Sequence, residues 1–195
     1  MLRHTASVLA ITAGLCAGAC DQNKKDTDAR PTTSASTTTT GARTTSDSNA
    51  LAMINALNQG EIDQANAAIP KLAHDDAKDF ADMMLKHHSE ALAKVSTIVI
   101  EQKMTMLDNA TSTAMKRDSA DLVGKMSTAT AGPVFDRMYM QAQVDGHTKA
   151  LRMIDNDILP NIDNMTLKNT VTEMRRQVQE HLAKAQGILG TMPAT

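Results

Sequence analysis

The chain has 195 residues, of which 42% are hydrophobic, and a formal net charge of −2 at pH 7. This length can bury the core of one domain but hardly of two. A charge so close to neutral, with acidic residues in excess, argues against nucleic acid as a partner. Aromatic residues make up 2% of the chain and Trp is absent, whereas Met occurs 14 times. Thioether side chains must therefore fill core space that aromatic rings usually fill.

The N-terminal residues have the pattern of an export signal. Arg3 precedes an apolar run from Ala6 to Ala19, which has the length of a signal-peptide core and is too short to span a membrane. We therefore interpret residues 1–19 as a signal peptide. The residues LCAGA before Cys20 resemble a bacterial lipobox, which predicts that Cys20 is lipidated and becomes the mature N-terminus. The same small residues also satisfy an ordinary cleavage rule, so a soluble secreted product is the alternative.

A polar segment follows, and we assign residues 20–48 to the lipidated cysteine and a Thr/Ser-rich linker. From Asp21 to Ser48 the chain has almost no large apolar side chains, and Thr37 to Thr40 form an unbroken run. Such a stretch cannot bury enough surface to offset its ordering entropy. We expect it to be disordered, as a leash between the membrane and a folded domain. Because both cysteines lie at or before residue 20, the mature chain has no internal disulfide and no cysteine nucleophile.

Apolar residues at helical spacing continue from about Asn49 to Gly190, which predicts an all-α domain over residues 49–190. Start and stop residues divide this domain into expected helices. They are a stretch from Asn49 with a kink or break at Gly60 and a stop at Pro70, a helix from Asp75 to about Lys103, a crossover over 104–130 with one helix from Thr111 to Met126, a helix from Pro133 ending before Pro160, and a last helix from near Asn164 to Gly190. This order is typical of a four-helix bundle with one long crossover.

Three histidines each fall on the apolar stripe of a different long helix. Steps of three and four residues place His88, His147 and His181 on the inward faces. The stripes are Ala81, Met84, His88, Ala91, Val95 and Ile98; Met140, Val144, His147, Leu151, Ile154 and Ile158; and Leu167, Val171, Met174, Val178, His181, Ala185 and Ile188. An unpartnered buried imidazole costs about 1–3 kcal/mol, so we expect these rings to bond to each other, to water or to a metal.

The register of the last two helices permits a joint site. Their loop is short, so they are antiparallel, and the backbones of His147 and His181 differ by about 9 Å along the bundle axis. Side chains lean toward the N-terminus of their own helix, which closes part of this offset.

The types of residue on these stripes favour some metals over others. Imidazole with thioether suits copper, and imidazole alone suits zinc or nickel. Met84, Met140 and Met174 lie on the same stripes and His87 lies one position off, so these are secondary candidate ligands, although a Met on a stripe more often fills the core. No Glu has a His three residues after it, which disfavours a ferritin-type di-iron site. No pattern of catalytic residues is present, and we assign none.

Several segments around the histidines resemble a known bacterial family. They are FADMMLKHHSEA around His88, FDRMY and QVDGHTKAL before and around His147, and EHLA around His181. They resemble the domain of unknown function 4142 family, whose members are often described as outer membrane proteins. The resemblance covers about Leu51 to Ile188 and implies a ferritin-like four-helix bundle in the cell envelope, without an established activity. Two Asp-His pairs are typical of that family, whereas here His87 and Gly146 replace the two aspartates.

Two interpretations of function remain open. In the first, the protein is a structural or interaction lipoprotein, anchored through Cys20 and facing the periplasm or the cell surface, and its buried histidines form a network that fixes helix register. An envelope protein would then be its partner. In the second, it is an envelope module that binds copper or zinc through His88, His147 and His181. A third hypothesis is a small-molecule carrier that uses the Met-rich core. An enzyme is a further alternative, but no pattern of residues supports one.

Overall fold

The computed structural model describes the backbone of residues 38–193 and the side chains from residue 46 onward. Over this range the chain is all-helical, with five α-helices and no strand, as the sequence predicts. The predicted signal peptide, Cys20 and the linker up to residue 37 lie outside the described residues. No helix within the described range is long and apolar enough to cross a membrane.

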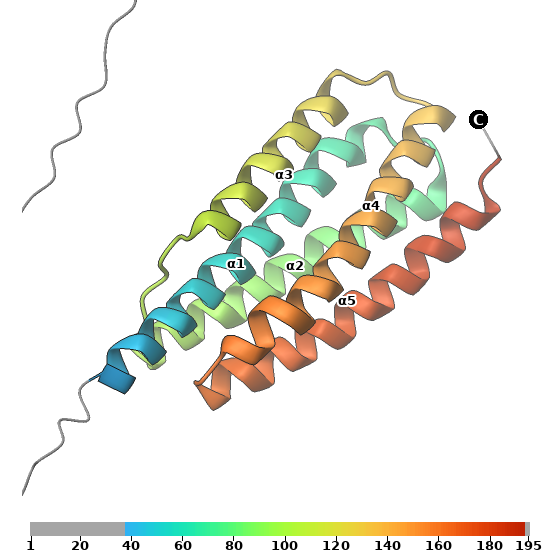
Figure 1. Cartoon of the computed structure of the whole chain (residues 1–195). Helices are drawn as coiled ribbons and strands as arrows, with labels where there is room; N and C mark the ends of the chain where they lie inside the picture. Colours follow the sequence, from blue (N-terminus) through green and yellow to red (C-terminus); the bar gives the residue numbers. More distant parts are fainter. Residues whose placement is uncertain (1–37, 194–195) are drawn as a thin grey trace, which may run out of the picture. The chain divides into compact units, whose positions relative to one another are not determined.

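The helices run lengthwise beside one another (Figure 1). They are α1 (Thr38–Ala68), α2 (Asp75–Glu101), α3 (Ala110–Thr128), α4 (Pro133–Met153) and α5 (Met165–Thr191), with 3-10 turns at Ile69–Lys71 and Leu159–Asn161 and a π-helical turn at Ile154–Ile158. The closest neighbours are α1 with α3, α1 with α2, and α4 with α5. Because α3 packs mainly on α1, the core lies chiefly among the other four helices.

The first helix begins earlier than its composition suggests. Residues 38–48, assigned to the linker on sequence grounds, are the first turns of α1. Tertiary hydrogen bonds connect Ser46 and Asp47, near the end of this segment, to another part of the chain. The Asp47 carboxylate accepts from the backbone N–H groups of Asp163 at 2.8 Å and Asn164 at 3.2 Å, and the Ser46 hydroxyl donates to the Asn161 carbonyl. These contacts join α1 to the loop before α5. The polar composition of the segment does not reveal them, because their partners lie more than a hundred residues away in the sequence.

Of the kink or break expected at Gly60, the break is absent, because α1 is continuous through this residue. Here the glycine permits close helix packing. A Cβ atom at Gly60 would lie 2.9 Å from the Ser119 hydroxyl oxygen of α3, and that hydroxyl donates to the Gly60 carbonyl at 3.4 Å. The missing side chain therefore lets α3 lie directly against α1. The expected stop at Pro70 is confirmed, since α1 ends at Ala68 and a short turn follows.

Most other helix ends agree with the sequence. Pro133 is the first residue of α4, and the Asn164 side chain caps α5 by accepting from the Leu167 N–H at 3.0 Å. The crossover helix α3 is slightly longer than predicted and begins with a capping box formed by Asn109 and Ser112.

The start of α2 depends on a contact from another helix. His74 is the N-cap residue but makes no side-chain capping bond. Instead, the buried carboxylate of Asp136, on α4, accepts from the backbone N–H groups of Ala73 at 2.9 Å and His74 at 3.0 Å. This interaction fixes α4 against the beginning of α2.

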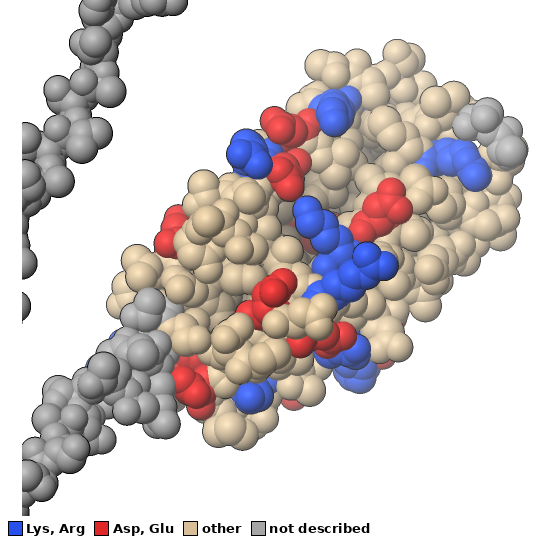
Figure 2. Space-filling view, in the orientation of Figure 1, with Lys and Arg blue, Asp and Glu red and all other residues tan. Residues whose placement is uncertain are grey.

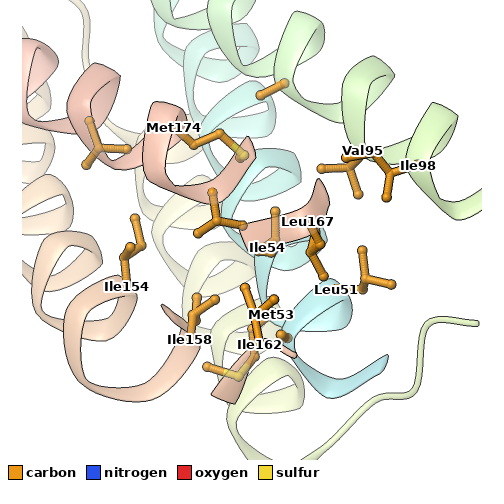
Figure 3. Packing of buried hydrophobic residues seen from close by; sticks show 14 of the residues in the cluster. Leu51, Met53, Ile54, Val95, Ile98, Ile154, Ile158, Ile162, Leu167 and Met174 are labelled. Atoms are coloured by element: carbon orange, nitrogen blue, oxygen red, sulfur yellow. The ribbon is translucent and has the colours of Figure 1, made fainter. Parts of the chain in front are cut away.

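The hydrophobic core consists of two clusters at different levels of the bundle. The first contains the early part of α1, the late part of α2, the end of α4 and the early part of α5; Figure 3 shows its members, including Leu51, Ile54, Val95, Ile158, Leu167 and Met174. The second contains the other ends of the same helices, including Ala65, Phe80, Met84, Tyr139, Met140 and Ile188, together with Met126 of α3.

Candidate metal centre

Buried polar residues separate the two apolar clusters along all four core helices. At the same intermediate positions of each helix, the buried residues are polar: Asn58, Glu61 and Gln64 on α1, His88 on α2, Gln143 and His147 on α4, and His181 on α5. We call this set the polar layer. Each helix thus carries buried apolar residues before and after its polar residues. The three predicted histidines belong to the polar layer.

The three histidines converge within the polar layer. One ring nitrogen from each of His88, His147 and His181 lies within 4.8 Å of the others. The ring centroids are 5.3–6.0 Å apart, and the residues are between 1% and 3% exposed. The three rings therefore lie together, as the register of the last two helices permits, and we call them the histidine cluster.

A side-chain amide fixes the tautomer of His88. The Asn58 amide nitrogen donates to the Ile54 carbonyl at 2.8 Å, which turns its Oδ1 toward His88. Since Oδ1 can only accept, the neutral His88 ring donates to it from Nδ1 at 2.9 Å. The Nε2 atom of His88 then carries a lone pair, and it has no hydrogen-bond partner in the described part of the chain.

A backbone carbonyl does the same for His147. Its Nδ1 lies 2.9 Å from the Gln143 carbonyl oxygen, one turn earlier in α4. The ring must donate there, so the lone pair of the neutral ring lies on Nε2. This Nε2 is also buried, and no described group bonds to it. Two lone pairs are thus directed into the interior by hydrogen bonds on the opposite side of each ring.

A half-buried histidine holds the third ring. His181 Nε2 lies 2.9 Å from Nδ1 of the half-buried His87, and the two rings stack with centroids 5.2 Å apart and an interplanar angle of 19°. The Nδ1 atom of His181 is buried without a partner among the described residues. When His181 donates to His87, this Nδ1 provides the third lone pair.

Burial keeps the His88 and His181 rings uncharged near neutral pH. It holds the pKa of His88 well below its ordinary value of 6.5, and the nearby His147, His181 and His87 lower the pKa further. For His181, burial together with His147, His87 and Lys184 lowers the pKa to about 3. Neutral imidazole is the form that binds a metal ion, so these two rings are ready to bind without losing a proton to solvent.

The methionine candidates lie in the apolar clusters on both sides of the polar layer. Met84 and Met140 belong to one cluster and Met174 to the other. Two acidic residues next to the histidines in sequence bond outside the cluster: Asp145 accepts from Gln141, and Glu180 pairs with Arg176.

The polar residues that support the histidine cluster were not predicted from the sequence. Asn58 and Glu61 continue the inward stripe of Leu51 and Ile54 at steps of four and three, and this polar interruption was the available signal. On α4 the expected stripe is partly wrong. The fully buried positions are Gln143 and Ala150, whereas the predicted Val144 and Leu151 are only partly buried.

A family model described as Domain of unknown function (DUF4142) matches residues 32–188. No curated protein and no solved structure matches the chain. The matched range contains the whole polar layer, and it confirms the resemblance found from the segments around the histidines. The chain therefore belongs to the domain of unknown function 4142 family.

Proposed function

We propose that this protein binds a transition-metal ion, with His88, His147 and His181 as ligands. The observation that carries the proposal is that each ring has a buried nitrogen with no hydrogen-bond partner in the described range. Such unpartnered groups are rare in folded proteins, and each costs about 1–3 kcal/mol. A single cation bound between the rings would satisfy all three.

The hydrogen bonds outside the cluster also support a metal. Metal-binding histidines usually donate their second ring N–H to a carbonyl or carboxylate, which fixes the tautomer and orients the ring. The Asn58 amide oxygen and the Gln143 carbonyl have this relation to His88 and His147. Both bonds orient the rings before any ion binds.

Three imidazoles suit zinc or copper best. Neutral imidazole binds both ions well, and three histidines leave a fourth position open, as in zinc sites that bind a water or a small ligand. Zinc–nitrogen bonds of about 2.1 Å place tetrahedral ligands roughly 3.4 Å apart. The present spacing, within 4.8 Å, means that the rings move slightly closer on binding.

A structural role of the polar layer is the second candidate. The bonds from His88 to Asn58 and from His87 to His181 link helices α1, α2 and α5, as a register-fixing network requires. In this alternative the cluster fixes the register of the helices without an ion. Its buried ring nitrogens without hydrogen-bond partners then lower the stability of the bundle in exchange for a single helix arrangement.

The cellular location belongs to the proposal as well, and it rests on the N-terminal sequence. We infer export through the signal peptide, lipidation of Cys20, and a position in the cell envelope facing the periplasm or the cell surface, where a protein partner is available. We also assign α1, α2, α4 and α5 to a ferritin-like four-helix arrangement, with α3 in the crossover. Labelling of cells with an alkyne fatty acid tests the anchor, since Cys20→Ser should abolish incorporation.

Metal loading and metal-dependent melting distinguish the two functions. The full chain, purified without a His tag, should bind close to one zinc or copper ion. Ligand at 100 times its dissociation constant should stabilise it by about 2.7 kcal/mol. The triple variant His88→Ala, His147→Ala, His181→Ala should lose both effects, whereas His74→Ala, outside the cluster, should keep them. Equal loading of the triple variant, or no loading of the wild type, would leave only the structural role.

A further inference from the structure

A second candidate site lies in a cavity between α1, α3 and α4. Its volume is about 360 Å³, and its walls are mostly small or apolar, among them Leu57, Met115, Leu122, Ala142 and Met153. This size is within the range of small-molecule sites. Figure 2 looks onto the face where α3 and α4 lie and shows acidic and basic side chains gathered along it. No histidine lines the cavity, so it is separate from the histidine cluster.

A buried carboxylate without a partner forms part of the cavity wall. Glu61 lines the cavity and is 7% exposed. Its Oε2 atom is itself inaccessible to solvent and has no hydrogen-bond partner in the described structure. The carboxylate lies over Gly146 of α4, where a Cβ atom would be 3.7 Å from Oε1. The carboxylate of α1 is therefore within ordinary van der Waals reach of α4 at this position. Burying a charged group is costly unless an opposite charge or hydrogen bonds compensate it.

The other charges of the cavity do not neutralise Glu61. Among the lining residues, Lys149 is the only basic one, and it pairs with Asp118 at 3.4 Å. Asp145 adds a further negative charge at the cavity. The lining thus has three carboxylates and one basic side chain, which is already paired. Such a cavity attracts positive charge.

We propose that this cavity binds a small organic cation, a primary or quaternary ammonium with an apolar body, and that Glu61 is its counter-ion. The apolar walls would cover the body, and the cationic end would compensate the buried carboxylate. A divalent metal ion fits less well, because hard cations require several oxygen ligands around one point and most of the wall offers none.

Matched ligands test charge selectivity on the full chain. Isothermal titration calorimetry would compare phenethylamine, benzyltrimethylammonium, the neutral 2-phenylethanol and the anionic 3-phenylpropanoate. We expect both cations to bind at least tenfold more tightly than the alcohol, and the anion to bind undetectably. Benzyltrimethylammonium has no lone pair and cannot bind a metal. Its affinity should therefore be the same in zinc-loaded protein, zinc-free protein and the triple histidine variant.

Substitutions inside and outside the cavity test whether the cations bind there. Glu61→Gln should weaken both cations at least tenfold and leave the alcohol unchanged, since it removes charge but little volume. Glu90→Gln, an exposed position on α2, should change nothing. Ala142→Leu, which fills the cavity, should weaken every ligand.

Three results would overturn the proposal: equal affinity of wild type for the alcohol and the cations, no binding of the cations, or unchanged cation affinity in Glu61→Gln. The ligand comparison on wild type decides the matter even if Glu61→Gln fails to fold. It also stands whether or not the histidine cluster binds metal.

Discussion

At the residue scale, two carbonyl oxygens determine what the histidine cluster can do. A neutral imidazole has one donor and one acceptor nitrogen, and the partner of the first decides where the second points. Asn58 and the Gln143 backbone bind the Nδ1 side of His88 and His147. The inner nitrogens are thereby left as acceptors, which repel one another unless a cation or a donor lies between them.

Removal of the amide should uncouple His88 from the cluster. In Asn58→Leu the His88 ring loses its only described acceptor, so either tautomer becomes accessible. We expect zinc affinity to fall 10–100-fold and the metal-free protein to lose about 1–2 kcal/mol. Zinc titration and urea denaturation would measure the two effects. The exposed Asn66→Leu is the control, and an unchanged zinc affinity in Asn58→Leu would argue against the orienting role.

Acid should destabilise the metal-free protein before most carboxylates titrate. Since the folded-state pKa values of His88 and His181 are lowered, the unfolded chain binds their protons below pH 6.5 while the folded chain does not. Stability is then fully present above pH 6.5 and falls by about 1.4 kcal/mol per pH unit for each histidine. For His181 this loss continues down to about pH 3.

Urea denaturation at pH 7, 6 and 5 measures this slope. The groups near the two rings are His87, His147 and Lys184, and none supplies a negative charge to favour protonation. His181→Gln should flatten the dependence by about one proton. A wild-type stability that is constant from pH 7 to 5 would contradict the expectation.

At the element scale, the glycines of the helices have different physical roles. Gly60 lies against Ser119, whereas Gly187 on α5 has open space around its Cβ position. Alanine favours helix over glycine by about 1 kcal/mol at either position. At Gly60 the new methyl group would meet a small side chain that has little freedom to move away.

The two alanine substitutions should therefore have opposite signs. We expect Gly187→Ala to stabilise the protein by about 1 kcal/mol and Gly60→Ala to destabilise it by about 1–2 kcal/mol through overpacking of α1 against α3. Chemical denaturation of the two variants beside wild type would show this. If Gly60→Ala is as stable as Gly187→Ala, α3 does not pack tightly on α1 in solution.

These elements also show what the sequence could predict. Pro133, Asn164 and Pro70 act through local backbone chemistry, so the helix ends near them were predictable. The start of α1 depends on Asp47 contacting a loop more than a hundred residues later, and the role of Gly60 depends on α3. Such partners are defined only after folding. The histidines could be found because the spacing of apolar residues along one helix is a local signal. Asn58 and Glu61 were not connected with them because that contact joins different helices.

At the scale of the whole molecule, the polar layer divides one core into two apolar parts. Four helices contribute to it, and α3 contributes only Met126 to the buried apolar clusters. A metal ion bound in the layer would connect α2, α4 and α5 directly and α1 through Asn58. The packing of α3 would be unaffected.

Hydrogen exchange can detect this division. Zinc should slow amide exchange around the polar layer in α1, α2, α4 and α5, because opening these helices would require release of the ion. Exchange in α3 should change little. The effect should disappear in the triple histidine variant, and equal slowing across all five helices would indicate a general effect of the ion instead.

The contact between Asp47 and the loop before α5 also has a mechanical consequence. A force applied to the N-terminal end of the chain reaches the domain through α1. The bonds from Ser46 and Asp47 to Asn161, Asp163 and Asn164 lie near the point where that force enters. These bonds would divide such a force between α1 and the start of α5, so two helices that lie far apart in the sequence would resist it.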